Sequence, residues 1–351
     1  MKKILTCLMA VLGLHSACGQ ANYENVDVNG FAKQVEAPGT VLLDVRTTSE
    51  YAEGHIEGAV LIDQGQSDFM EKVKAVLPKN KKIAIYCRSG RRSANAAGKL
   101  AAEGYQCVNL KGGIMAWKEA GKSVTTNRYE VDVFKTKSGK TVKFHALVHA
   151  SIRLEYDGRE IEIDPVTKLG NRTIDYTAMP KANIILLTHE HGDHFDKEAI
   201  RLLSDDATQL ITNRRCADML GSGTVMANGD KMQITDDIMV EAVPAYNISE
   251  GRTQFHPKGR DNGYILTVDG LRIYVAGDTE DIPEMASIKD IDIAFLPCNQ
   301  PYTMTTEQLV KAARTVNPKV LFPYHYGQTD VTMLPSQLQS AGIDVRIRHY
   351  E

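Results

Sequence analysis

An apolar run that ends in a cluster of histidines most constrains how this chain can fold. Residues 183–194 read NIILLTHEHGDH, so a segment of strand length leads directly into three histidines and an aspartate. In an extended chain alternate side chains point to the same side, which would place His189 and His191 together. Two imidazoles on one side make half of a tetrahedral metal site. The glycine that follows allows a turn, which would direct Asp193 and His194 toward a second ion.

Other polar residues follow apolar runs in the same half of the chain. Asp278 comes after RIYVAG, and His325 comes after VLFPY. Strand patterns separated by Ser-Gly and Asp-Gly turns begin near residue 130, and helical patterns such as TEQLVKAARTV lie between some of the later strands. Strand-rich sequence mixed with helices, with polar clusters at strand ends, predicts two layered sheets flanked by helices.

A second polar cluster follows a strand-like run earlier in the chain. The stretch IYCRSGRRS places Cys87 after the apolar run and before a helical pattern that begins near Ser93. Loop N–H groups and the helix N-terminus supply positive potential there, and Arg88, Arg91 and Arg92 add to it. These features favour the thiolate and a nucleophilic cysteine. The alternative is a structural cysteine that precedes a basic surface loop.

The region around this cysteine alternates between strand and helix patterns, from about residue 22 to 123. TVLLDV, KKIAIYC and QCVNL are typical of strands, and SANAAGKLAAEG and GGIMAWKEAG are typical of helices. Such alternation predicts a parallel sheet with helices on its faces. The length of 351 residues suffices for two domains, with a boundary near residue 124. The net charge of −3 gives no reason to expect nucleic acid or a membrane surface as a partner.

The first 21 residues have the pattern of an export signal. Lys2 and Lys3 precede the apolar stretch ILTCLMAVLGL, and small residues follow. The sequence SAC that ends at Cys18 resembles a bacterial lipobox, in which this cysteine would be lipidated; ordinary cleavage after Ala17 or Ala21 is the alternative. We therefore expect export to the periplasm or a lipid anchor at the cell envelope, with no other contact to the membrane.

Residues 25–122 resemble the rhodanese domain, a sulfurtransferase, and we take residues 22–123 as that domain. The motifs that carry the resemblance are LLDVRTTSEYAEGHIEGAVLI, CRSGRRS and LKGGIMAW. The resemblance implies a loop from Cys87 to Arg92 in which Cys87 carries a persulfide and Arg88 and Arg92 assist. The sulfur donor would be a sulfane-sulfur compound such as thiosulfate or a persulfide.

The remainder resembles the metallo-β-lactamase superfamily, and we take residues 124–351 as that domain. The resemblance rests on HASIRLEYDGREIEIDPV, the HxHxDH motif, AGDT and PYHY, and is strongest to the branch containing L-ascorbate-6-phosphate lactonase. It implies an αββα sandwich with one or two zinc ions, manganese or iron being the other metals considered. By this resemblance one metal would be held by His189 and His191, the second by Asp193, His194 and His325, with Asp278 bridging them.

The chain departs from the superfamily pattern at one ligand position. The superfamily usually has a further histidine after the strand that here reads VEAVPAYN, where this chain has Asn247. An amide oxygen is a weaker zinc ligand than an imidazole, so the first site should bind zinc less tightly. Asn247 would coordinate directly, orient a water or leave a position open. His256, in the polar stretch QFHPKG, is a further residue that could turn into the site, but a His-Pro in a polar loop is more often exposed, and exposure is what we expect.

These observations predict an exported hydrolase joined to a sulfurtransferase. Metal-activated water would attack an ester, lactone, amide or phosphoester of a small molecule, with Asp193 or Asp278 accepting a proton. One alternative is an iron-dependent persulfide dioxygenase, a class that also combines the two folds. In another, the rhodanese half only binds or senses a partner. The substrate, the metal stoichiometry, the coupling between domains and the oligomeric state are left open.

Overall fold

The computed structural model describes residues 23–37, 39–126, 129–170 and 172–350. The expected export signal, including Cys18, lies outside these described residues. Among them, no helix combines the length and the apolar character that crossing a membrane requires. The expected domain boundary near residue 124 falls between a last helix that ends at Glu119 and a strand that begins at Glu130.

The N-terminal unit is built on a five-stranded sheet. Its strand order is β1-β5-β4-β2-β3, and all its pairings are parallel. The strands are β1 Glu24–Val26, β2 Thr40–Asp44, β3 Val60–Leu61, β4 Lys82–Tyr86 and β5 Gln106–Leu110. The helices are α1 Val28–Glu36, α2 Thr48–Ala52, α3 Phe69–Val76, α4 Arg91–Ala102 and α5 Gly113–Glu119.

Helices cover both faces of this sheet, as the alternation of strands and helices predicted. Along β4, Ile83 and Ile85 belong to a core formed with α3 and α4. Ala84 and Tyr86 belong to the core on the other face, which α1 and α5 complete. Alternate side chains of β4 thus pack on opposite faces of the sheet, which holds this central strand in place. Cys87 follows directly at its carboxyl end.

The C-terminal unit contains two seven-stranded sheets that lie face to face. The first has the order β14-β13-β12-β9-β8-β7-β6 and the second has the order β15-β16-β17-β18-β19-β20-β21. The strands of the first are β6 Glu130–Lys135, β7 Thr141–Val148, β8 Ser151–Tyr156, β9 Arg159–Ile163, β12 Ile184–Leu187, β13 Gln209–Thr212 and β14 Thr224–Val225. Those of the second are β15 Lys231–Thr235, β16 Ile238–Ala245, β17 Asp261–Val268, β18 Leu271–Val275, β19 Ile293–Pro297, β20 Val320–Tyr324 and β21 Asp344–Val345. A short hairpin joins β10 Lys168–Leu169 to β11 Arg172–Thr173.

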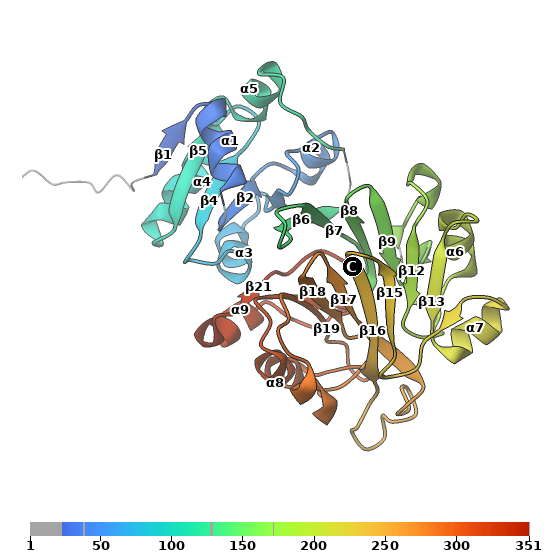
Figure 1. The fold of residues 1–351 in the computed structure, drawn as a ribbon. Coiled ribbons are helices and arrows are strands. Elements are labelled where there is room, and N and C mark those ends of the chain that lie inside the picture. Colours follow the sequence, from blue (N-terminus) through green and yellow to red (C-terminus); the bar gives the residue numbers. More distant parts are fainter. Residues whose placement is uncertain (1–22, 38, 127–128, 171, 351) are drawn as a thin grey trace, which may run out of the picture.

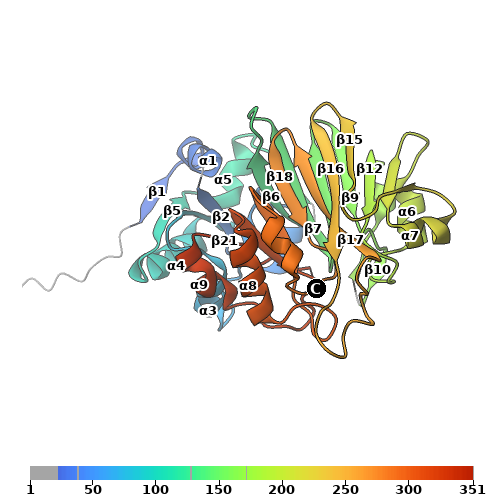
Figure 2. The ribbon, with the colours of Figure 1, turned by 60° about the horizontal axis from the view of Figure 1, so that its bottom comes forward.

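Helices flank this pair of sheets on both outer faces (Figures 1 and 2). One outer core packs α6 Lys197–Leu203 and α7 Arg214–Leu220 on the first sheet, and another packs α8 Thr306–Val316 and α9 Leu334–Leu338 on the second. The largest core lies between the sheets and contains Phe144, Leu186, Phe295 and Phe322. Three short 3-10 helices complete the described elements: η1 Tyr176–Ala178, η2 Pro283–Ser287 and η3 Gln339–Ala341. The predicted αββα sandwich is confirmed.

Candidate metal centre

Residues from several loops of the C-terminal unit meet in one cluster of imidazoles and carboxylates. The loops follow β7, β12, β16, β18 and β20, and the residues they contribute form three overlapping groups whose ligand atoms lie within 4.8 Å of one another. The first group is His189, His191 and His256, the second is His149, Asp193, His194 and His325, and the third is His189, His194 and Asp278. Each group has the donor atoms to hold a metal ion.

The first group consists of three imidazoles. His189 Nε2 lies 3.1 Å from His191 Nδ1, and His256 Nε2 lies 3.2 Å from the same atom. The rings of His189 and His256 are buried, whereas His191 is partly open to solvent. Three ring nitrogens at such separations resemble the three-histidine ligand set of a tetrahedral zinc site.

The second group surrounds the carboxylate of Asp193. Asp193 Oδ2 lies 3.2 Å from His149 Nε2, 3.4 Å from His325 Nε2 and 3.9 Å from His194 Nε2. His149 and His325 have positive φ angles of 55° and 48°, a conformation that costs free energy for a residue with a Cβ. Such backbone strain is concentrated at functional sites, and here it directs both rings into the cluster.

Asp278 lies between the two groups. Its carboxylate oxygens are 3.2 Å from His194 Nε2 and from His325 Nε2, and 3.4 Å from His256 Nε2. The distance to His189 Nε2 is 3.9 Å. A carboxylate that reaches imidazoles of both groups occupies the place of a bridging ligand, as the resemblance implied.

Hydrogen bonds behind the cluster fix the orientation of two rings. Asp164 Oδ2 accepts from His194 Nδ1 at 2.8 Å and from the Thr188 hydroxyl at 2.6 Å. The Thr188 hydroxyl in turn lies 3.0 Å from His189 Nδ1. Because Nδ1 is used in both histidines, the Nε2 atoms face the cluster, which is the arrangement found in metal-ligating histidines.

Several buried atoms of the cluster lack any hydrogen bond within the described structure, although they lie close together. They are His194 Nε2, His325 Nε2 and Asp278 Oδ1. Buried polar atoms normally have a partner, and atoms that converge on a common point without bonding one another fit a metal ion. The residues present therefore suit the ions that this fold would carry.

The electrostatics of the cluster are strongly coupled. Burial lowers the pKa of His189 well below its usual value and lowers the pKa of His256 to about 4. Burial acts in the same direction on His194, but the carboxylates of Asp278 and Asp164 outweigh it and raise the pKa of His194 well above its usual value. Burial would raise the pKa of Asp278, but His325 and His194 outweigh it and hold that pKa well below its usual value. Burial is likewise outweighed at His325, where Asp278 and Asp193 raise the pKa to about 9. Metal binding would displace a proton from His194 and from His325.

The structure corrects one sequence expectation and adds one residue. His256 was expected to be exposed, and this is wrong: the residue is 1% exposed and its ring lies inside the cluster. The loop after β16, which carries His256, folds back toward the cluster. His149 was not expected as a member of the cluster, although it directly follows the strand pattern TVKFHALV, and a polar residue at a strand end was an available signal. Asn247 lies beside the cluster, with its side-chain nitrogen bonded to the main-chain oxygens of Tyr302 at 2.7 Å and Arg252 at 3.3 Å.

The cysteine loop lies in the N-terminal unit, at the start of α4. The Cys87 sulfur is buried and accepts from Gly90 N at 3.2 Å and from the Ser93 hydroxyl at 3.3 Å. Arg88 is exposed, whereas Arg92 is half-buried and forms two bonds to the Glu50 carboxylate at 2.5 and 2.7 Å. The expected donors around the sulfur are therefore present, while the Arg92 guanidinium is engaged by Glu50.

A glycine allows the loop to approach its neighbour closely. A Cβ on Gly113 would lie 2.4 Å from the main-chain oxygen of Cys87 and 2.6 Å from that of Arg88, and Gly113 also has a positive φ of 61°. Any larger residue would push α5 away from the loop. The second glycine of LKGGIMAW thus allows α5 to pack closely against the cysteine loop.

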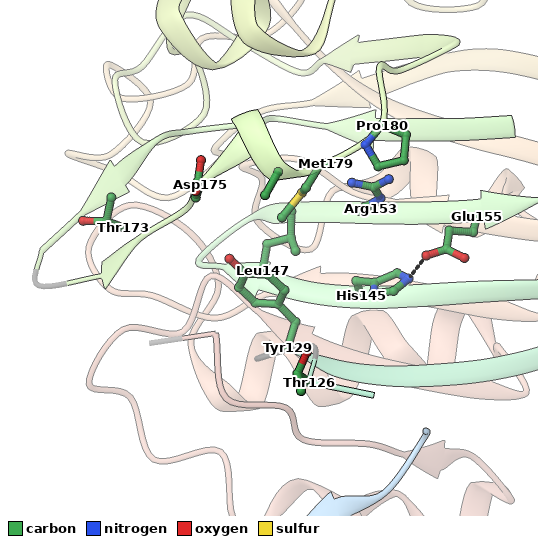
Figure 3. Close-up of a pocket in the computed structure, with 11 residues that line it drawn as sticks. Thr126, Tyr129, His145, Leu147, Arg153, Glu155, Thr173, Asp175, Met179 and Pro180 are labelled. Atoms are coloured by element: carbon green, nitrogen blue, oxygen red, sulfur yellow. Dashed lines mark ion pairs between the residues drawn. The ribbon is translucent and has the colours of Figure 1, made fainter. Parts of the chain in front are cut away.

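A cavity of about 520 Å³ lies apart from both sites (Figure 3). Figure 3 shows the His145–Glu155 ion pair (2.7 Å), with Arg153, Met179 and Pro180 drawn close together above it. None of the residues that line it belongs to the metal cluster or to the cysteine loop. Because it contains no residue of either site, we assign this cavity no part in the chemistry of the two sites.

Comparison with known proteins agrees with the architecture. The family model of the β-lactamase superfamily domain matches residues 143–325, and that of the rhodanese-like domain matches residues 27–120. A UPF0173 metal-dependent hydrolase of Geobacillus thermodenitrificans is 32% identical over 195 residues, which are 53% of this chain and 84% of the relative.

Two solved structures are also similar. A proposed metal-dependent hydrolase of Parabacteroides distasonis is 53% identical, with a TM-score of 0.62, and the match covers 64% of this chain and 100% of that protein. A metallo hydrolase of Ignicoccus hospitalis is 27% identical, with a TM-score of 0.51, over 59% of this chain and 94% of that protein. The chain thus belongs to the β-lactamase superfamily, and a rhodanese-like domain precedes its metallo-β-lactamase-fold domain.

Proposed function

We propose that the C-terminal domain is a metal-dependent hydrolase of small molecules that contain an ester, lactone, amide or phosphoester. The observation that carries this proposal is the placement of Asp278 between two groups of imidazoles. The similar proteins of Geobacillus and Ignicoccus are named as hydrolases, which supports the same reaction class.

His189 and His191 would hold one ion, and the second group, which surrounds Asp193, would hold the other. Divalent ions at such a centre lower the pKa of a coordinated water toward neutrality and stabilise negative charge on an attacked carbonyl or phosphoryl group. Imidazole-rich ligand sets suit zinc, and we propose zinc as the metal. Asp193 is the better placed proton acceptor, because its side chain is 33% exposed whereas that of Asp278 is 3% exposed.

Metal content and substrate turnover test this proposal together. Elemental mass spectrometry of the purified chain should give up to two zinc ions, and a panel of ester, lactone, amide and phosphoester substrates should contain one that is hydrolysed. His194→Ala should abolish that turnover, whereas His349→Ala, at an exposed histidine outside the cluster, should not. A single iron ion, together with oxygen consumption on a persulfide, would favour the dioxygenase instead.

For the N-terminal domain we propose sulfur transfer through Cys87. The thiolate would attack the outer sulfur of thiosulfate, so that a Cys87 S–S bond forms, the bond to the sulfite group breaks and sulfite leaves. A thiophile such as cyanide would then take the terminal sulfur and restore the thiolate. The donors from Gly90 N and Ser93 Oγ, with the N-terminus of α4, support negative charge on the sulfur.

Cys87→Ser distinguishes catalysis from a binding or sensing role of this domain. The substitution should remove thiocyanate formation from thiosulfate and cyanide, while the metal content of the second domain is unchanged. Equal activity of the variant and the wild type would refute the role of Cys87.

Export is a further part of the proposal. It is supported by Lys2, Lys3 and the apolar stretch that follows them. If Cys18 is lipidated, the full chain expressed in a Gram-negative bacterium should be recovered in the membrane fraction and should incorporate labelled palmitate, which Cys18→Ser should abolish. Ordinary cleavage after Ala17 or Ala21 would instead give a soluble periplasmic chain without label. Recovery of an uncleaved chain in the cytoplasm would contradict export.

A further inference from the structure

The loop between β16 and β17, residues 246–260, brings an imidazole to the place where the superfamily pattern lacks one. The histidine expected after β16 is Asn247 in this chain, and nine residues later the same loop returns His256 to the cluster. His256 Nε2 lies 3.2 Å from His191 Nδ1 and 3.4 Å from Asp278 Oδ2. The ring is therefore within reach of both the first imidazole group and the bridging carboxylate.

The other ring nitrogen of His256 is already occupied. His256 Nδ1 donates to the main-chain oxygen of Tyr302 at 3.2 Å. A main-chain carbonyl can only accept, so Nδ1 carries the hydrogen and the Nε2 lone pair points at the cluster. This is the outer hydrogen bond that typically orients a metal-ligating histidine.

The Asn247 side chain binds the same main-chain oxygen. Its Nδ2 donates to Tyr302 O at 2.7 Å, and its main-chain N donates to His256 O at 2.9 Å. The residue that replaces the usual histidine thus fixes both the backbone of His256 and the acceptor of its ring. Asn247 Oδ1 has no hydrogen-bond partner in the described structure, so an amide ligand is the competing assignment that an experiment must separate.

The loop is anchored on both sides of His256. The buried Glu280 carboxylate accepts from Ile248 N at 2.7 Å and from Ser249 N at 2.6 Å. On the other side, Arg260 donates to Phe255 O at 2.8 Å and forms two bonds to Asp261. A loop held in this way presents its ligand without a large ordering cost.

We infer that His256 is the third imidazole ligand of the first ion, in place of the side chain at position 247, and that Asn247 is its positioning residue. This assignment rests on the proposed metal centre but not on the proposed reaction. It implies that the first site regains a nitrogen ligand that the superfamily pattern alone would count as lost, so both sites remain suited to zinc.

Metal binding to the full chain tests the assignment without an activity assay. The metal-free protein is titrated with Zn²⁺ against a chromophoric chelator, and bound zinc per chain is counted by elemental mass spectrometry. The wild type should bind two ions. His256→Ala and the bulkier His256→Gln should each keep one ion and weaken the other by more than ~100-fold, beyond the ~10–100-fold cost of removing an outer hydrogen-bonding residue.

Two further variants separate the competing assignment. Asn247→Ala should still bind two ions, with the first weakened by no more than ~10–100-fold, as expected for a residue that acts through His256. His349→Ala, at an exposed histidine, is the matched control and should bind as the wild type does. The assignment is overturned if both His256 variants bind two ions with wild-type affinity, or if Asn247→Ala loses the first ion while they keep it. The assignment of His256 is tested by zinc affinity and zinc content, whereas the proposed reaction is tested by substrate turnover.

Discussion

Asp164 and His194 form a fully buried pair in which the carboxylate Oδ2 lies 2.8 Å from the imidazole Nδ1. The same carboxylate accepts from the main-chain N of Thr188 at 2.8 Å and from its hydroxyl, so each of its oxygens has a donor. The Asp164 carboxylate connects the two imidazole groups on the side away from the ligand atoms. It bonds His194 of the second group directly, and it reaches His189 of the first group through the Thr188 hydroxyl. Asp164 itself has a positive φ of 46°, which the surrounding contacts must hold in place.

Asp164→Asn should weaken the metal centre without removing a ligand. The NH₂ of an asparagine cannot accept a hydrogen bond, so at least one group that now donates to Asp164 would lose its acceptor. The His194 ring would then lose its orientation. We expect zinc affinity to fall ~10–100-fold, measured by competition with a chelator. The matched control is Asp157→Asn, the same change at an exposed turn residue with φ of 50°. Equal affinity of Asp164→Asn and the control would contradict this role.

Returning a histidine to position 247 should compensate for the loss of His256. In the double variant Asn247→His/His256→Ala, the imidazole stands where the superfamily pattern has it, so part of the lost affinity of the first ion should return. We expect a recovery of at least ~10-fold relative to His256→Ala alone, since an imidazole is a better zinc ligand than any group left near the site. Chelator competition on the two variants measures the difference, and zinc affinity no higher in the double variant would contradict the prediction.

The sequence allowed the site to be predicted where strand geometry dictates it. The alternation that places His189 and His191 together is a property of a regular strand. Asp278 and His325 were predicted from the resemblance to the superfamily, and the structure places them after the parallel strands β18 and β20. His256 was mispredicted because it stands in an irregular loop, where no period relates sequence position to direction. Only the folded contacts of the loop, with Tyr302 and Glu280, determine where its ring points.

The same limit applies to the cysteine loop. Cys87 and its loop follow from a strand that runs into a helix start, and the structure places donors on the sulfur as expected. The bonds between Arg92 and Glu50 could not be foreseen, because 42 residues separate them and Glu50 belongs to the capping box of α2. The guanidinium was expected to add charge near the sulfur, and the structure adds that it is held by a carboxylate.

Glu50→Gln should therefore slow sulfur transfer although Glu50 does not touch Cys87. The amide loses one of the two charged bonds to Arg92, so the end of the cysteine loop becomes less ordered. We expect a several-fold fall in kcat/KM for thiocyanate formation, with the zinc content of the second domain unchanged. Glu57→Gln, which removes an exposed ion pair with Lys143 instead, is the control and should keep wild-type activity. Equal rates for both variants would show that the Arg92–Glu50 pair has no influence on transfer.

Glu162 should make the folded state less stable as the pH rises. It is fully buried on β9, both of its carboxylate oxygens lack a hydrogen bond in the described structure, and its contact to Arg153 is 3.6 Å long while that arginine bonds Glu160 at 2.9 Å. Burial raises the pKa of Glu162 to about 8. Between the ordinary glutamate pKa and that value the folded state binds one proton more than the unfolded state. The free energy of unfolding therefore falls with pH across this window, by about 1.4 kcal/mol per pH unit.

Glu162→Gln removes this proton and keeps the shape of the side chain, so the variant should gain stability over the wild type as the pH is raised from 5 to 8. Urea unfolding at several pH values measures the difference, and the other titrating groups cancel because both chains share them. Glu198→Gln, at an exposed glutamate whose pKa is lowered by the hydrogen bond from Arg201, should show no such growing gain. A constant difference between Glu162→Gln and the wild type from pH 5 to 8 would mean that Glu162 is already ionised in the folded state, and that Arg153 rather than burial sets its charge.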